Sequence, residues 1–257
     1  MTPYERHIRL DGAHNVRDLG GYATAAGGTT RWRSFLRADA LHELNSDDIQ
    51  MLLQLGLRTV IDLRSDGEIA RQPSVFADHE EVRYHHVPLF DGLAPVDAMM
   101  TDTSGFDLAA RYIEAADRCH PAIARVALTI AHAEKGIVLF NCTAGKDRTG
   151  IVAAMLLSLA GVDDDQIAAD YAMTATIAGA LMEKLKGHAV ARGLDETVSS
   201  RLLASEPAAM LSFLRHMDER YGGFAAYLTD RVADADGIHI IRKRMLAGIA
   251  QPFANNR

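Results

Sequence analysis

The chain has 257 residues, of which 48% are hydrophobic and 24% are charged, and its formal net charge is −7. This composition is typical of a soluble globular protein and excludes collagen-like, disordered and low-complexity classes. The acidic balance argues against nucleic acid or an anionic membrane as a general partner, although a small basic pocket is compatible with it. The two cysteines, Cys119 and Cys142, cannot form a disulfide framework, so we expect single thiols in a reducing compartment.

Residues 1–12 contain several charges and lack the apolar segment of a secretory signal. No part of the sequence approaches the ~18 consecutive apolar residues of a membrane-spanning helix. We therefore expect a cytoplasmic protein without stable membrane insertion, although export by a route without a cleavable signal would leave no trace in the sequence.

Strand and helix patterns alternate through the first part of the chain. A helix is expected from Ser46, with an acidic first turn, to a stop at Gly56. Short apolar, β-branched runs predict three strands, and helical spacing predicts two helices before the third strand. This alternation predicts an α/β fold with a largely parallel central sheet flanked by helices. The strands are expected at 59–63, 82–87 and 136–140, and the helices at 107–118 and from Pro121 onward.

The rest of the chain consists of one irregular segment and a helical portion. Residues 91–105 mix Gly, Pro, Met and Thr without a period, which fits either a lid or an irregular surface loop. After Gly161 the patterns are helical, with punctuation at 222–223 and Gly237. Since no linker or repeat is visible, we expect a single domain, 1–257, with its core at about 10–175 and a helical C-terminal portion at about 176–257. The helical stretches are expected from 163 onward, at 177–185, at 207–221 and at 224–232.

Residues 138–157 carry the most informative motif: an apolar strand, the loop Asn-Cys-Thr-Ala-Gly-Lys-Asp-Arg-Thr-Gly, and an apolar helix. This arrangement directs backbone N–H groups and the positive end of a helix dipole to one point, where they favour a dianion. Gly145 lets the backbone turn closely around a ligand, Arg148 offers paired donors to phosphate oxygens, and Lys146 adds a point charge. The same field favours the thiolate of Cys142, which is then placed to attack a bound phosphate monoester.

The spacing Cys-x5-Arg is not specific by itself, because Cys119 has Arg125 at the same distance. The residues between them contain no glycine, and the segment has the pattern of a helix start. We therefore interpret Cys119 as an inert, partly buried thiol. Around Cys142, by contrast, a strand precedes the motif, glycine and cations lie within it, and Thr149 opens a helix after it.

At these residues the sequence resembles the cysteine-dependent protein tyrosine phosphatase superfamily, whose signature is His-Cys-x5-Arg-Ser/Thr. The loop is most similar to that of bacterial tyrosine phosphatases with a Gly-Lys-Asp-Arg-Thr-Gly sequence, some of which also accept phosphoserine, phosphothreonine or phosphoinositides. Supporting matches lie at 15–22, 35–38, 60–64 and 170–174. The resemblance implies a tyrosine-phosphatase-like fold, and a mechanism that needs no cofactor and no metal.

By this resemblance, Cys142 is the nucleophile, and Arg148 binds the phosphate and stabilises the transition state. Thr149 would donate a hydrogen bond to the sulfur. Asn141 stands where the superfamily has His, and its amide is expected to hydrogen-bond backbone groups. The backbone amides that would hold the phosphate oxygens belong to Thr143, Ala144, Gly145, Lys146, Asp147 and Arg148.

A general acid must protonate the leaving oxygen. The closer family suggests Asp147, inside the loop. Asp91, which follows the strand that ends near Pro88, is the rival, because other branches of the superfamily place their acid on a loop at this point. Asp62 and Asp66 are weaker alternatives, and Asp62 is expected to form a structural ion pair.

Further polar residues have two interpretations each. Arg17 and Asp18 could fasten the N-terminal segment under the loop, although a plain turn with an ion pair is the favoured interpretation. For Arg64, structural and substrate-facing roles are open in the same way. No metal-ligand spacing is recognisable among His79, His85 and His86.

The leading hypothesis is a phosphomonoester hydrolase that acts on phosphotyrosine in proteins. Phosphoinositides are the nearest rival substrates, because Lys146 beside Arg148 suits a polyphosphorylated headgroup. A non-catalytic phosphate-binding module is the alternative from another class. A sulfurtransferase is disfavoured because residues 148–150 open a helix, and a nucleotide-binding P-loop is excluded because Phe140 occupies the position of its first glycine. The oligomeric state stays open.

Overall fold

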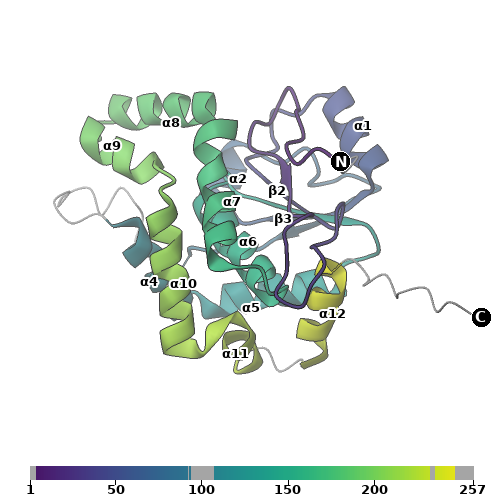
Figure 1. Cartoon of the computed structure of the whole chain (residues 1–257). Coiled ribbons are helices and arrows are strands. Elements are labelled where there is room, and N and C mark those ends of the chain that lie inside the picture. Colours follow the sequence, from purple (N-terminus) through teal and green to yellow (C-terminus); the bar gives the residue numbers. More distant parts are fainter. Residues whose placement is uncertain (1–3, 92, 94–106, 232–234, 247–257) are drawn as a thin grey trace, which may run out of the picture.

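The computed structural model describes residues 4–91, 93, 107–231 and 235–246 (Figure 1). Over these residues a five-stranded sheet has the order β1-β2-β5-β3-β4, and all neighbouring strands are parallel except β1 and β2. The expected α/β class and largely parallel sheet are therefore confirmed. The strands are β1 (Arg17–Asp18), β2 (Phe35–Ala38), β3 (Leu57–Asp62), β4 (Arg83–His86) and β5 (Ile137–Asn141).

The described residues form eleven helices around this sheet (Figure 1). Within the described ranges, none has the length and apolar character needed to cross a bilayer. In chain order they are α1 (Ser46–Leu55), α2 (Asp66–Arg71), α4 (Leu108–Arg118), α5 (His120–His132), α6 (Asp147–Leu159), α7 (Asp164–Ile177), α8 (Gly179–Ala191), α9 (Glu196–Leu203), α10 (Pro207–Tyr221), α11 (Gly223–Thr229) and α12 (Ala235–Met245).

Strand β5 separates two apolar layers. Val138 and Phe140 belong to the larger layer, which includes buried side chains of α4–α7 and α10–α12. Ile137 and Leu139 belong to the smaller layer, together with Leu52 of α1. Because successive side chains of a strand point to opposite faces, a strand covered on both sides is apolar at every position. This explains the continuous apolar run that precedes Cys142.

Helix α6 lies at the centre of the larger layer, since residues 149–157 are all buried. It contacts β2 and β5 of the sheet as well as α7, α11 and α12. Helix α10 packs on α4 and α7, and α12 packs on α5 and α6. Helices α10–α12 thus share one core with α4–α7.

Several expected boundaries are confirmed. Helix α10 occupies 207–221, as expected, and Pro207 stands in its first turn. Asp107 is the N-cap of α4 and accepts a hydrogen bond from the backbone N–H of Ala109, which satisfies one of the free donors at a helix start. The two predicted helices before β5 are therefore α4 and α5, with Pro121 in the first turn of α5.

Other boundaries differ from the expectation. Helix α1 begins at Ser46 and stops at Gly56, as expected, but its N-cap is Asn45, whose side chain accepts from the N–H of Asp48. The stretch expected at 177–185 is divided at Ala178, where α7 ends and α8 begins. Gly237 lies inside α12 instead of between helices. Most of the segment interpreted as a lid or surface loop, 94–105, lies outside the described residues, as does Val232.

Candidate active site

The loop 142–146 connects the end of β5 to the first turn of α6, as the motif predicts. Gly145 has a φ of +64°, and a Cβ at this position would lie 2.7 Å from the carbonyl group of Ala38 at the end of β2. Only glycine combines this left-handed conformation with so close an approach of two backbones. Cys142 is 2% exposed, and neither cysteine is in a disulfide.

Arg148 is held in a bidentate ion pair by Glu68 of α2. Its Nη1 and Nη2 donate to the two carboxylate oxygens of Glu68 at 2.6 and 2.8 Å. Thr143 joins the pair, since its hydroxyl donates to Glu68 and accepts from Nη2 of Arg148. Burial alone would lower the pKa of Arg148, but the hydrogen bonds that it donates to Glu68 and the negative charges of a Cys142 thiolate and of Glu68 raise it. The Cys142 sulfur and the Arg148 guanidinium are therefore close enough to interact electrostatically.

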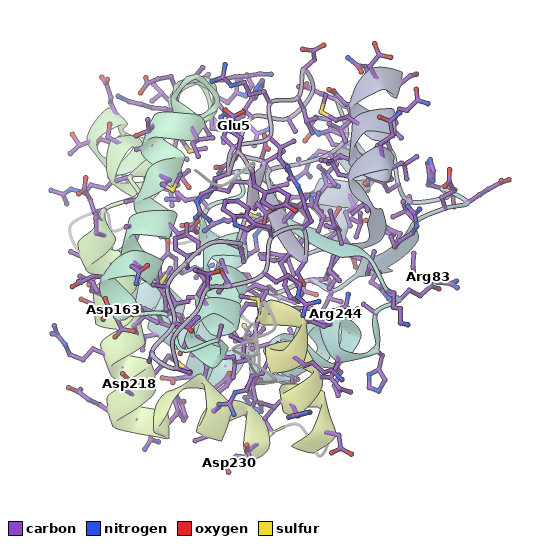
Figure 2. All side chains as sticks on the ribbon, turned by 45° about the vertical axis from the view of Figure 1, so that its right-hand side comes forward. Glu5, Arg83, Asp163, Asp218, Asp230 and Arg244 are labelled. Atoms are coloured by element: carbon purple, nitrogen blue, oxygen red, sulfur yellow. The ribbon has the colours of Figure 1, made fainter. Side chains whose placement is uncertain are left out.

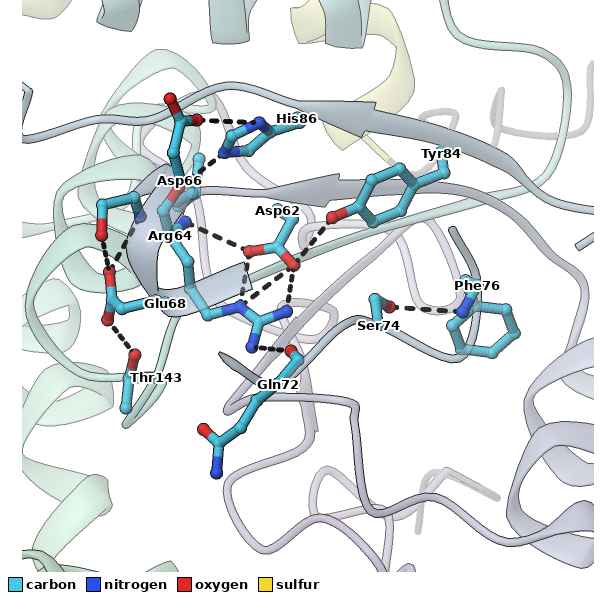
Figure 3. Close-up of polar contacts among 12 residues, drawn as sticks. Asp62, Arg64, Asp66, Glu68, Gln72, Ser74, Phe76, Tyr84, His86 and Thr143 are labelled. Carbon is cyan, nitrogen blue, oxygen red and sulfur yellow. Dashed lines mark hydrogen bonds and ion pairs between the residues drawn. The ribbon is translucent and has the colours of Figure 1, made fainter. Parts of the chain in front are cut away.

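Glu68 was not found by sequence reasoning. It is the third residue of α2 and completes a capping box, in which Oε2 accepts from the N–H and the hydroxyl of Ser65 at 2.8 and 2.9 Å (Figure 3). Although burial would raise the pKa of Glu68, its hydrogen bonds to Arg148 and the charge of that residue lower it well below its usual range. The sequence signal was Ser-x-x-Glu just after a strand, which identifies the helix start but not the contact with Arg148.

The Asp147 carboxylate lies in a polar network that reaches α4 and α7. Tyr112 donates to Asp147 Oδ1 at 2.5 Å, and the hydroxyls of Tyr112 and Tyr171 are 2.6 Å apart. Burial raises the pKa of both tyrosines, and the charge of Asp147 raises it further. The two tyrosines thus remain protonated, and Tyr112 donates its hydrogen bond to Asp147.

Lys146 does not take the expected place beside a phosphate. Its side chain is fully buried, and Nζ donates to the backbone carbonyls of Leu202 and Ala204 at 2.6 and 2.7 Å. Nζ also lies 3.1 Å from Oδ1 of Asp147. A lysine at the end of a helix is stabilised by the free carbonyls there, so Lys146 fastens the end of α9 to the loop.

Buried polar side chains donate hydrogen bonds to the backbone carbonyls of the loop. Asn15 donates to the carbonyl of Ala144 at 2.8 Å, and Arg37 donates to the carbonyl of Gly145 at 2.8 Å. Arg37 and Arg17 both pair with Asp170 of α7, at 2.5 and 3.2 Å.

The pKa of Asp170 is lowered by these two cations although burial opposes the shift. Arg17 and the N-terminal segment therefore do fasten the loop, which is the interpretation that the sequence did not favour. Asp18 acts differently: its carboxylate accepts from the backbone N–H groups of Gly20 and Arg33 at 2.8 and 3.0 Å.

Two expected hydrogen bonds are not formed among the described residues. Both side-chain polar atoms of Asn141 are buried without a partner, so its expected hydrogen bonds to backbone groups are not formed. The Thr149 hydroxyl is also buried without a partner, and its bond to the sulfur is absent. Both groups lie on the two elements that flank Cys142, at the end of β5 and in the first turn of α6.

The remaining carboxylates divide into one structural residue and one exposed residue. Asp62 forms the expected ion pair with Arg64, 2.7 Å apart, and also accepts from Tyr84 (Figure 3). Asp91 is exposed and follows Phe90, whose ring centroid lies 5.8 Å from Cζ of Arg148. Asp91, the alternative general acid, therefore lies at the edge of the same site.

The other expected residues stay outside the site. Asp66 is exposed in the first turn of α2 and lies 3.7 Å from His86, which itself contacts the carbonyl of Arg64 (Figure 3). Within the described part of the chain, no group of three His, Cys, Asp or Glu side chains could hold a metal ion.

Comparison with known proteins places the chain in a family. The model of the family described as "Tyrosine phosphatase family" matches residues 8–247. A tyrosine-protein phosphatase of Nostoc commune is 38% identical over 55% of this chain, and the match spans only 48% of that protein.

Two longer matches cover most of both chains. A Cupriavidus necator protein that bears the name of tyrosine-protein phosphatase is 30% identical over 88% of this chain and 84% of its own length. The triple specificity protein phosphatase PtpB of Mycobacterium tuberculosis is 28% identical over 86% of this chain and 92% of its own length.

Proposed function

The chain belongs to the tyrosine phosphatase family, and on this premise we propose that it hydrolyses phosphotyrosine in proteins through a phosphocysteine intermediate on Cys142. The observation that carries the proposal is the pairing of two groups across one loop. A buried cysteine directly follows β5, and an arginine in the first turn of α6 is fixed by Glu68 where it would interact with a thiolate at that cysteine.

In the first step, the Cys142 thiolate attacks phosphorus, and the bond between phosphorus and the phenolic oxygen breaks. The backbone N–H groups of residues 143–148 and the guanidinium of Arg148 stabilise the charge on the phosphoryl oxygens. In the second step, water attacks phosphorus and releases the thiolate and inorganic phosphate. The buried, unpartnered hydroxyl of Thr149 is available to donate to the departing sulfur.

Asp147 supplies the proton to the phenolic oxygen and recovers one from the attacking water. The hydroxyl of Tyr112 and the ammonium of Lys146 hold the Asp147 carboxyl group in place for both proton transfers. Asp91 is the second candidate for the general acid, because it is exposed and directly follows Phe90, whose ring lies beside Arg148. Replacing each by Asn separates them: the variant that lacks the true acid loses the basic limb of the pH profile of kcat, whereas Asp78→Asn, also exposed, leaves the profile unchanged.

Phosphotyrosine is favoured over a phosphoinositide by the position of Lys146. A polyphosphorylated headgroup needs additional cations beside Arg148, but the ammonium of Lys146 is buried against the end of α9. Phosphotyrosine peptide should therefore be a better substrate than a phosphoinositide headgroup. Because one relative is named a triple specificity phosphatase, phosphoserine and phosphothreonine peptides should be assayed together with these two substrates.

The decisive assay compares the native chain with Cys142→Ser on a phosphotyrosine peptide. The native chain should release phosphate, and the variant should not, although it keeps its fold. Phosphate release by the variant, or failure of the native chain on all four substrate classes, would refute the proposal. Rapid acid quench with a labelled substrate should trap label on Cys142.

Two wider features of the proposal concern the chain as a whole. Residues 1–257 form one phosphatase domain, and the support for this is the core that α10–α12 share with α4–α7 together with the contact between Lys146 and the end of α9. The protein acts in the cytoplasm, where the thiols of its two cysteines stay reduced.

A further inference from the structure

A second basic site lies at the opposite end of β5 from Cys142. A cavity of about 460 Å³ opens between Ser34, which precedes β2, the turn before β5, and α12. Figure 2 labels Arg244, which lines this cavity from the C-terminal end of α12. Since β5 spans five residues and a strand rises ~3.3 Å per residue, the two sites are separated by about 15 Å or more.

The cavity is cationic although the protein carries a net charge of −7. Its lining includes five cations and no carboxylate; the cations are Arg31, Arg33, Lys135, Lys243 and Arg244. Among the described residues, Arg33 alone of these five has an acidic partner, with Asp18 3.4 Å away. Like charges gathered without counter-charges repel one another, so the cluster is stabilised when an anion enters.

Two of the guanidinium groups are fixed in place by backbone carbonyls rather than by acids. Arg244 donates to the carbonyls of Ala133, Glu134 and Gly136 at 2.8 to 3.1 Å. Arg31 donates twice to the carbonyl of Leu246, at 2.9 and 3.0 Å. These bonds orient the side chains but leave their positive charges uncompensated. The site is therefore organised before a ligand arrives, which lowers the entropic cost of binding.

A buried donor and a strained residue also indicate a ligand site at this cavity. Among the described residues, Nε of Arg244 is buried without a hydrogen-bond partner, and a buried donor without an acceptor costs free energy. Arg33 is also the one non-glycine residue in the described chain with a positive φ, at +58°. Such strain of about 1 kcal/mol or more is found preferentially at functional sites. Both observations are independent of the count of charges.

We propose that this cavity binds a compact anion that carries two or more phosphate groups. Arginine forks recognise phosphate oxygens in pairs, and several cations without carboxylates match more than one dianion. The volume is that of a small-molecule site. A nucleic acid strand would instead need an extended basic groove with aromatic platforms. The ligand is either a free polyphosphate or the headgroup of an anionic lipid, and the test separates these sources.

The test measures binding of pyrophosphate by titration calorimetry. Because pyrophosphate also fits the proposed catalytic loop, the background is Arg148→Ala, with the native chain measured in parallel in case that variant loses its fold. Pyrophosphate should bind the background variant, and binding should weaken as ionic strength rises. The double variant Lys135→Glu with Lys243→Glu, two exposed side chains, should weaken this binding by about tenfold or more.

The matched control reverses two exposed cations of α10, in Arg215→Glu with Arg220→Glu. It changes the net charge equally and should leave binding unchanged. Both double variants should keep the native phosphatase activity on a small phosphomonoester. Absence of binding in the Arg148→Ala background together with a single site in the native chain, or equal binding by the two double variants, would overturn the proposal.

Vesicles identify the source of the phosphate. Phosphatidylcholine vesicles that contain phosphatidic acid should sediment the native chain if a lipid headgroup is the ligand, and the Lys135→Glu, Lys243→Glu variant should remain in solution. If pyrophosphate binds and the vesicles do not, the ligand is a soluble anion. Both results support an anion site at this cavity.

Discussion

Cys119 and Cys142 are each followed by an arginine six residues later, yet only the second segment brings its cysteine and its arginine to the same loop. Cys119 lies between α4 and α5 in the apolar core, and Arg125 is exposed on α5. Cys142 directly follows a strand, and Arg148, in the first turn of α6, donates to Thr143 beside it. The spacing has chemical meaning only where a strand end and a helix start bring the two residues to one loop.

The two segments also differ in what supports them. The Cys142 loop rests on Asn15, Arg37 and, through Arg37, on Asp170, all fully or nearly fully buried. Before Cys119, Asp117 contacts Tyr221 and His216 on the surface. A catalytic loop needs fixed geometry, and a buried charge network provides it at a cost in desolvation.

The largest expected effect is on stability. Asp170→Asn leaves Arg17 and Arg37 buried without a counter-charge, so the free energy of unfolding should fall by about 3–5 kcal/mol. Asp117→Asn, at a carboxylate that is 43% exposed, should cost less than about 1 kcal/mol. Urea unfolding followed by circular dichroism measures both. Equal losses would show that the Cys142 loop has no special support.

The next effect is on catalysis. Arg148→Lys keeps a positive charge but removes the fork that Glu68 holds, so kcat/KM on a phosphotyrosine peptide should fall by about 10²–10³-fold. Arg125→Lys makes the same change in the other segment and should leave kcat/KM within about twofold. A similar loss in both variants would mean that the arginines act through stability instead of through phosphate.

Alkylation compares the two thiols directly. Iodoacetate at mildly acidic pH should modify Cys142 at least about tenfold faster than Cys119, because the thiolate is the reacting species and the proposed mechanism requires a thiolate only at Cys142. Inorganic phosphate should protect Cys142 and leave the rate at Cys119 unchanged. Peptide mass spectrometry over time gives both rates. Faster labelling of Cys119 would reverse the assignment of the nucleophile.

The sequence predicted the parts of this site that are local. The strand, the loop and α6 lie within some twenty consecutive residues, and Gly145 adopts the left-handed conformation that the motif requires. The helix α10 was predicted to its ends because Pro207 and Gly222 mark them. In each case the determining interactions lie within one or two turns of the chain.

The features that the sequence did not predict depend on contacts between residues that are far apart in the chain. Lys146 binds carbonyls 56 and 58 positions away, and Glu68 reaches Arg148 across 80 positions. Strand β1 has two residues and pairs antiparallel at the edge of the sheet, which is too short for a periodic signal. For Asn141, a polar residue at the end of a strand suggested hydrogen bonds, but the packed neighbours of β5 provide none.

The smallest effect isolates the charge of Glu68. Its pKa is lowered in the folded protein, so its ion pair stabilises the fold above the ordinary Glu pKa of ~4.3, and this stabilisation is lost as pH falls below that value. Glu68→Gln should therefore be less stable than the native chain by about 1 kcal/mol at neutral pH, and the difference should shrink in acid, as measured by urea unfolding at several pH values.

Glu134→Gln is the matched control, because Glu134 forms an exposed ion pair with Arg83, 3.5 Å apart, away from the candidate site. Its stability should differ from the native value by less than about 0.5 kcal/mol at every pH. If Glu68→Gln behaves in the same way, the carboxylate does not fix Arg148. If Glu68→Gln also raises KM for the peptide while kcat changes less, the ion pair positions the arginine for phosphate binding, which Cys119 and Arg125 cannot reproduce at the same spacing.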